Sequence, residues 1–124
     1  MSSSQPFRVL AFVPELLTCI RIESGVQRLG GFLESAESLD GFARALHTRP
    51  ALAIFDLAID WVDIGELVRE CMSAGVPLLV FGPHVDRGVL REARDAGADF
   101  VFPRSKLMTD VTGTLREVLA GARA

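Results

Sequence analysis

Short apolar runs alternate with helical patterns along the chain, and this alternation constrains the possible fold more than any other feature of the sequence. Apolar runs predict strands at 8–13, 32–33, 51–57, 78–81 and 100–102. Helical spacing of apolar residues predicts helices at 15–29, 38–46, 61–75 and 86–97, and a last one that starts near 109. The strand runs are continuous rather than alternating, as expected for strands that are buried on both faces.

Strand–helix alternation of this kind predicts right-handed βαβ units and a parallel sheet covered by helices on both faces. With five such units the expected fold is a three-layer α/β/α, flavodoxin-like arrangement with strand order 2-1-3-4-5. A length of 124 residues suits one domain with one core. We therefore predict a single domain over 1–124, in which 1–6 form a disordered polar tail.

The composition argues against several classes of function. The formal charge is −3 at pH 7, which is unfavourable for a surface devoted to binding nucleic acid. No apolar run approaches the roughly 20 residues of a membrane-spanning helix, and the N-terminus lacks the basic start and cleavage site of a signal peptide. A cytoplasmic location without membrane contact is expected. Arginine supplies all but one of the 13 basic residues, which indicates a GC-rich bacterial genome.

Helical spacing also assigns individual side chains to the core. The third predicted helix carries its apolar stripe on Trp61, Ile64, Leu67, Val68 and Cys71. Cys19 falls in a similar pattern in the first helix. We expect both thiols to be buried and to act as small hydrophobic groups, because metal binding needs further ligands nearby.

Asp56 ends the third apolar run and marks the expected position of a functional site. A carboxylate at the exit of a buried strand costs free energy unless a partner at the sheet edge uses it. In open α/β sheets, ligands bind just beyond the carboxyl ends of the strands. The residues that surround Asp56 therefore decide what this edge of the sheet can do.

Three segments resemble the receiver domain of two-component response regulators. Residues 49–57 (RPALAIFDL) are similar to the family's third strand, which ends in the phospho-accepting aspartate. Residues 77–81 (PLLVF) are similar to its fourth strand, and 96–99 (AGAD) to the turn into its fifth. The resemblance extends over about 7–119. It implies an aspartyl phosphate formed on Asp56 with the help of Mg²⁺.

The chain departs from the family's pattern at most other site positions. Val13 and Pro14 stand where the resemblance implies a magnesium-binding acidic pair, and Gly82 stands where it implies a hydroxyl residue. The family's lysine corresponds to Arg104, which now follows a proline, and its switch aromatic corresponds to Val101. A single carboxylate is a poor site for Mg²⁺, because most of the ion's charge stays uncompensated.

Asp56 then needs another partner, and Arg104 is the expected one. The ends of the third and fifth strands face the same crevice, and a guanidinium can hold a carboxylate with two hydrogen bonds. We hypothesise that an Asp56–Arg104 pair replaces the metal. In the alternative interpretation, Asp56 faces solvent or accepts hydrogen bonds from backbone N–H groups of its own loop.

The remaining polar candidates have ordinary structural interpretations. Glu15, Asp60 and Asp63 stand at predicted helix starts, where carboxylates cap the helix and complement its dipole. His84 lies in a loop beside the expected site, where a lone histidine is most often solvated. His47 ends the second predicted helix and suits its C-terminal dipole.

Arg87, Arg91 and Arg94 lie on one side of the fourth predicted helix. Interspersed acidic residues make a plain solvated face one interpretation of this stripe. The resemblance implies another, because receivers usually meet their partners through the fourth helix, fifth strand and last helix. On that interpretation the stripe, with Val101, would bind an acidic partner protein or a second copy of the chain.

Three functional hypotheses follow. The first is an atypical receiver, not an enzyme, that signals by protein–protein contact and uses no cofactor. The second is a working phospho-receiver with an unusual Mg²⁺ site that uses Asp56, Glu15 and loop carbonyls. The third is a small-ligand or enzymatic flavodoxin-like domain, against which stand the missing glycine-rich phosphate loop and the missing nucleophile–base pair.

Overall fold

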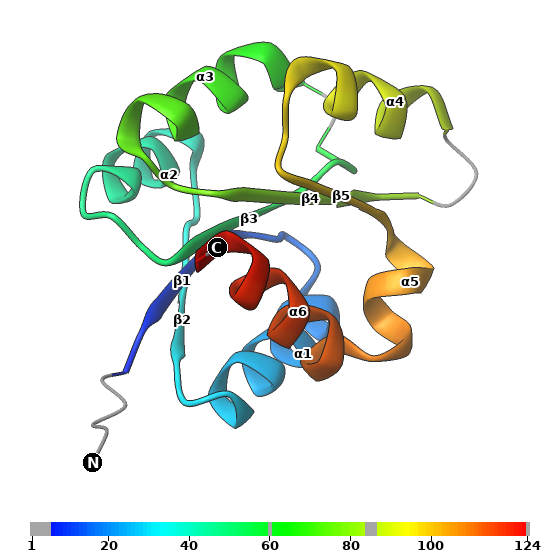
Figure 1. The fold of residues 1–124 in the computed structure, drawn as a ribbon. Coiled ribbons are helices and arrows are strands. Elements are labelled where there is room, and N and C mark those ends of the chain that lie inside the picture. The colour runs from blue at the N-terminus through cyan, green and yellow to red at the C-terminus, as the bar shows by residue number, and fades with distance from the viewer. Residues whose placement is uncertain (1–5, 60, 84–86, 124) are drawn as a thin grey trace.

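A parallel sheet of five strands forms the middle layer of the molecule (Figure 1). The computed structural model describes residues 6–59, 61–83 and 87–123. The strands are β1 (Arg8–Phe12), β2 (Phe32–Ser35), β3 (Leu52–Asp56), β4 (Leu78–Gly82) and β5 (Phe100–Pro103). Their order is β2-β1-β3-β4-β5, and every neighbouring pair is parallel. The predicted strand order is therefore confirmed.

Helices cover both faces of this sheet. They are α1 (Leu16–Arg28), α2 (Leu39–Leu46), α3 (Ile64–Ala74), α4 (Arg87–Ala96), α5 (Arg104–Thr109) and α6 (Val111–Arg123). Figure 1 shows α2, α3 and α4 on one face and α1, α5 and α6 on the other. The predicted three-layer, flavodoxin-like architecture is confirmed. No helix among the described residues is long and apolar enough to cross a membrane.

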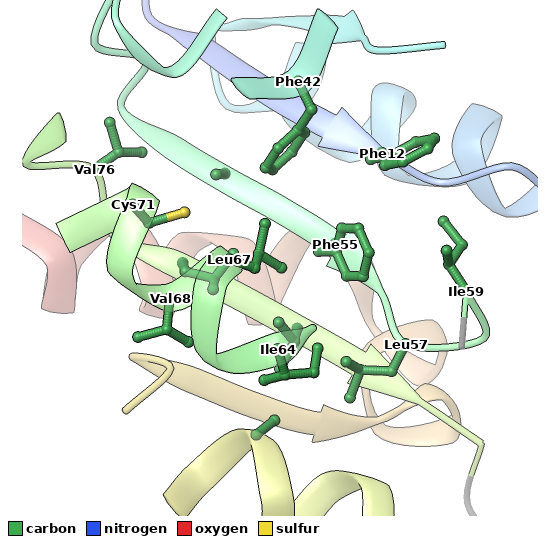
Figure 2. Close-up of a cluster of buried hydrophobic side chains, with 14 of the residues drawn as sticks. Phe12, Phe42, Phe55, Leu57, Ile59, Ile64, Leu67, Val68, Cys71 and Val76 are labelled. Atoms are coloured by element: carbon green, nitrogen blue, oxygen red, sulfur yellow. The ribbon is translucent and has the colours of Figure 1, made fainter. Parts of the chain in front are cut away.

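Two apolar clusters fill the spaces between the layers. The cluster under α2, α3 and α4 contains three phenylalanines in mutual contact, Phe12, Phe42 and Phe55, with ring centroids 5.6–6.2 Å apart (Figure 2). Cys71 packs in the same cluster and is buried, as predicted. The cluster on the opposite face joins β1, β3 and β4 to α1, α5 and α6. Strands β3 and β4 are buried along their whole length, which explains their continuous apolar sequence.

Local capping residues set most helix ends as the sequence predicts. The Ser38 hydroxyl accepts from the backbone N–H of Gly41 at 3.0 Å. Gly75 and Gly97 follow α3 and α4 with φ of 72° and 105°, a left-handed conformation that favours glycine. Asp86, the first residue of the fourth predicted helix, lies outside the described part of the chain, as do the loop residue His84, the helix-start residue Asp60 and the tail residues 1–5.

The region after β5 differs from the prediction of one last helix that starts near 109. A separate helix, α5, begins directly after Pro103, and Asp110 divides it from α6. Asp110 is extended (φ −152°), and its carboxylate accepts from the backbone N–H of Gly113 at 2.9 Å. The physical reason for the division is this local cap, because an aspartate that bonds a backbone N–H three residues on starts a new helix.

The prediction that Trp61 belongs to the buried stripe of α3 is wrong. Helix α3 begins only at Ile64, so Trp61 precedes it, and its side chain is 68% exposed. The turn before the Asp63 cap breaks the helical spacing on which the prediction depended. Cys19 is only half-buried, with its sulfur 3.3 Å from the Ser35 hydroxyl, so the prediction of a buried thiol fails there too.

Candidate functional site

Asp56 is the last residue of β3 and is only 1% exposed. Its neighbour across the sheet is Phe81 of β4, and the next strand along, β5, ends at Pro103. Because parallel strands bring their carboxyl ends to one edge, the first residue of α5, Arg104, starts at the same edge as Asp56. The topology therefore brings together two residues that are 48 positions apart in the chain.

Arg104 forms an ion pair with this buried carboxylate. Its Nη2 atom donates to both carboxylate oxygens of Asp56, at 3.0 Å to Oδ2 and 3.1 Å to Oδ1. Asp56 Oδ1 also accepts from the backbone N–H of Ala58 at 2.9 Å. The hypothesis of a direct Asp56–Arg104 pair is confirmed, and so is the loop hydrogen bond proposed as its alternative; exposure of Asp56 to solvent is not observed.

The Asp56–Arg104 pair is not the arrangement in which two guanidinium nitrogens each bond one carboxylate oxygen, because only one terminal nitrogen of Arg104 reaches Asp56. The other, Nη1, donates to the hydroxyl of Thr18 in α1 at 3.2 Å. The guanidinium also lies over the ring of Phe81, with its central carbon 5.0 Å from the ring centroid. Three elements, α1, β3 and β4, thus hold Arg104 in one orientation, although 31% of its side chain remains exposed.

Thr18 joins the pair to Glu15, the N-cap of α1. Glu15 Oε1 accepts from both the hydroxyl and the backbone N–H of Thr18, and Oε2 accepts from the N–H of Leu17. The bonds from Thr18 are the main reason that the pKa of Glu15 is lowered, and the Arg104 charge adds to this effect. The predicted capping role of Glu15 is confirmed. Sequence reasoning missed Thr18, whose only signal was a polar residue in the first turn after β1.

The two residues that stand where the resemblance implies Mg²⁺ ligands are apolar. Val13 is 7% exposed and packs in the cluster under α1, α5 and α6, whereas Pro14 is exposed. Neither side chain offers an oxygen. Glu15 holds its carboxylate on the helix N-terminus of α1. In the described part of the chain, no group of three His, Cys, Asp or Glu side chains could hold a metal ion.

A side chain at Gly82 would crowd its neighbour Leu57. A Cβ atom at this position would lie 3.1 Å from Cβ of Leu57, closer than ordinary contact, and 3.4 Å from its Cδ1. Leu57 is buried, and its backbone N–H bonds the carbonyl of Phe81 at 2.8 Å, so it has little freedom to move. Donor set and packing around Asp56 together do not fit Mg²⁺, which requires several oxygen ligands at short, nearly octahedral positions.

The remaining predicted residues lie away from Asp56. Asp63 caps α3 by accepting from the N–H of Glu66 at 3.2 Å, as predicted. His47 follows the last residue of α2 and is exposed. Arg91 and Arg94 are exposed on α4, and Arg87 is the first residue of that helix. Val101 is half-buried and packs on the cluster under α2, α3 and α4, so its small side chain belongs to the core.

This fold, with its order of strands and helices, is the fold of response-regulator receiver domains. A receiver domain of CheY-like type from Methanospirillum hungatei superposes with a TM-score of 0.77 at 16% identity, over 96% of this chain and 98% of that one. The receiver domain of a sensor histidine kinase from Pseudomonas aeruginosa, solved with a magnesium ion in its active-site cleft, gives 0.74 at 15% identity, over 93% and 95%.

An orphan response regulator of H. pylori gives a TM-score of 0.73 at 18% identity, over 92% of this chain and 94% of that one. No model of a protein family and no curated protein sequence matches the chain. Identities this low establish the shared fold, so the function has to be argued from the residues at the site.

Proposed function

We propose that this chain is an atypical receiver domain of bacterial signal transduction, which acts by protein–protein contact with little or no Mg²⁺-dependent phosphorylation. The observation that supports the proposal is the contact of Arg104 Nη2 with both oxygens of the buried Asp56 carboxylate. On this proposal the domain is cytoplasmic, carries no catalytic activity of its own and needs no cofactor.

Asp56 would be the nucleophile of a phosphorylation reaction. Its carboxylate is 1% exposed and both of its oxygens accept hydrogen bonds from a cation, so it is poorly accessible to a phosphoryl donor and its negative charge is already compensated. Breaking that pair leaves a carboxylate buried without a counter-charge, a costly state. The gathering negative charge of a phosphoryl group would also lack the metal and hydroxyl groups that stabilise it in phosphoryl transfer.

One observation favours the second hypothesis, a receiver that is still phosphorylated on Asp56. The Arg104 side chain is 31% exposed, so it has room to swing outward and contact a phosphoryl group. Arginine binds phosphate oxygens well, and its charge would partly replace that of Mg²⁺. The two hypotheses differ in one measurable quantity, the phosphorylated fraction of the wild-type chain.

Intact-protein mass spectrometry after incubation with acetyl phosphate and Mg²⁺ separates them. We expect no mass gain of a phosphoryl group in the wild type and none in Asp56→Asn, which is the matched control. A gain that requires Asp56 would contradict the proposal and favour the working receiver. A crystal structure with Mg²⁺ bound beside Asp56 would contradict it as well.

Partner binding is proposed for the face formed by α4, β5 and α6, or for a homodimer through the same face. Arg91 and Arg94 stand exposed on α4 and give it positive charge. Sedimentation velocity of the wild type and of Arg91→Glu/Arg94→Glu tests the homodimer. A concentration-dependent dimer that the double variant weakens supports this face, whereas a dimer of unchanged affinity argues against it.

A further inference from the structure

A groove between α2 and α3 has the features of a second binding surface. Its volume is about 480 Å³. Helices α2 and α3 lie on the face of the sheet opposite α1 and α6 (Figure 1). Phe42 and Leu67, both members of the buried cluster drawn in Figure 2, line it together with the partly buried Leu39 and Val62. Phe42 and Leu67 are themselves buried, so the apolar surface that the groove offers comes from Leu39, Val62 and Trp61.

Trp61 stands at this groove with 68% of its surface exposed. It is the only tryptophan of the chain. Leaving so large an apolar side chain in water forgoes a sizeable hydrophobic gain. Exposed tryptophan beside an apolar hollow is typical of the residues that dominate protein–protein binding energy. Core packing does not account for its position, because Trp61 belongs neither to the buried cluster nor to the partly buried residues packed on it.

The charged residues of the groove all have the same sign. Asp40, Asp63, Glu66 and Glu70 line it, and no described residue that lines it is basic. Within the part of the chain that the structure describes, ion pairs are formed by Arg8 with Glu34 and by Arg104 with Asp56, so none neutralises these four carboxylates. A groove lined by four carboxylates and by no described basic residue favours a positively charged occupant.

The hollow also continues along the helices. A neighbouring depression of about 290 Å³ shares Ala43, Glu66 and Glu70 with the groove and extends past His47 to Arg69. A continuous, elongated surface of this kind suits a helix or extended segment better than a compact small molecule.

We propose that the groove between α2 and α3, with Trp61 at its edge, binds a positively charged amphipathic helix of a partner protein. Apolar side chains of that helix would pack on Trp61, Leu39 and Val62, and its arginine or lysine residues would pair with Glu66 and Glu70. This surface is separate from the α4 face, and its use depends neither on Asp56 nor on phosphorylation.

The same experiment distinguishes one other occupant of the groove, a second copy of the chain, and one other binding surface, on α1. A second copy of the chain would bring the arginines of α4, Arg91 and Arg94, to the groove of its neighbour. That contact joins unlike surfaces and would produce rings or open-ended assemblies rather than symmetric dimers. The exposed apolar residues of α1, Leu16, Leu17 and Ile20, form a competing surface on the other face of the sheet.

The probe is a synthetic helical peptide with leucine and phenylalanine on one face and flanking arginines, without tryptophan. Its matched control carries glutamate in place of each arginine. Because Trp61 is the only tryptophan, its emission reports occupancy of the groove directly. We expect a blue shift with the arginine peptide, and at least about tenfold weaker binding of the glutamate peptide at low salt.

Variants of the domain test the residues. Glu66→Gln/Glu70→Gln should weaken binding of the arginine peptide by about fivefold to tenfold, as two rim ion pairs would. Glu92→Gln/Glu117→Gln, which removes two exposed carboxylates from α4 and α6, should change it less than about twofold. Trp61→Ala, measured by anisotropy of labelled peptide, should lose most of the binding.

Several results would overturn the proposal. One is the absence of binding up to about 1 mM peptide, since that excludes an affinity of functional use. Equal loss of peptide binding in the two glutamine double variants would show that the effect depends only on the net charge of the domain. Backbone amide shifts in α1 rather than in α2 and α3 would place the peptide on the other surface. Open-ended self-association that Glu66→Gln/Glu70→Gln abolishes would identify a second copy as the occupant.

Discussion

Replacing Arg104 by methionine is the most direct test of the ion pair at the site. Methionine keeps much of the side-chain length, but it removes the contacts to both oxygens of Asp56, the bond to Thr18 and the stacking on Phe81. The carboxylate of Asp56, 1% exposed, then stays buried, and among the described residues the N–H of Ala58 is its remaining donor. The variant should therefore be much less stable than the wild type.

The magnitude follows from the burial of the two partners. Breaking a fully buried ion pair costs roughly 3–5 kcal/mol. The Arg104 side chain is 31% exposed, so water reaches the pair and the cost should fall to about 2–3 kcal/mol. With a urea dependence of roughly 1–3 kcal/mol per molar, the midpoint of unfolding should move down by about 0.7–3 M.

Urea unfolding followed by circular dichroism measures this change. Arg104→Lys is an informative second variant, because a single nitrogen carries the contact with Asp56 and lysine can retain it while losing Thr18 and Phe81. We expect it to cost about 1 kcal/mol. Arg116→Met, an exposed arginine of α6, is the matched control and should stay within about 0.5 kcal/mol of the wild type.

A double-mutant cycle with Asp56→Asn isolates the interaction. If the pair stabilises the fold as argued, Arg104→Met should cost clearly less in the Asp56→Asn background, with a coupling free energy of about 1–3 kcal/mol. Additive effects of the two substitutions would refute the reasoning. So would a loss below about 0.5 kcal/mol in Arg104→Met alone, since that is the scale of an exposed ion pair.

Three further predictions concern residues near and away from the site. The pKa of Glu15 is lowered, so its contribution to stability is present above its ordinary pKa of 4.5 and is lost as the pH falls through the pKa of the folded state. The difference in unfolding free energy between the wild type and Glu15→Gln should therefore shrink on acidification to about pH 3. A difference independent of pH would contradict this. Gly82→Thr should lower the unfolding free energy by about 1–3 kcal/mol in urea titrations, because its Cβ would crowd Leu57, and unchanged stability would show that this space is free. Burial raises the pKa of Cys71 to about 12, so a thiol reagent such as dithionitrobenzoate should modify only the half-buried Cys19 in the native state and both cysteines in urea; rapid native modification of Cys71 would be inconsistent with its position in the core.

Local sequence determined the architecture of this chain to a large extent. Continuous apolar runs are a direct consequence of burial on both faces of a sheet, and β3 and β4 show that burial along their whole length. Ser38, Asp63 and Gly75 end or begin helices through contacts with residues only a few positions away. Such contacts depend on local sequence alone, so the sequence predicts them.

The Asp56–Arg104 pair was also predictable, because strand topology alone brings the ends of β3 and β5 to one edge of the sheet. The other contacts of Arg104 were not predictable. Thr18 of α1 and Phe81 of β4 reach Arg104 from elements distant in sequence, and they decide that a single nitrogen contacts Asp56. The periodicity of the sequence does not predict which side chains from separate layers of the fold contact each other.

Trp61 shows the same limit of prediction from sequence, here through a prediction of burial that was wrong. Its spacing from Ile64 and Leu67 matches a helical stripe, yet the chain turns at the Asp63 cap and leaves the indole exposed at the groove between α2 and α3. Periodicity determines which face of an element is apolar, because that face depends only on the geometry of one helix or strand. Whether a given side chain is covered depends on the packing of neighbouring elements, which only the tertiary structure decides.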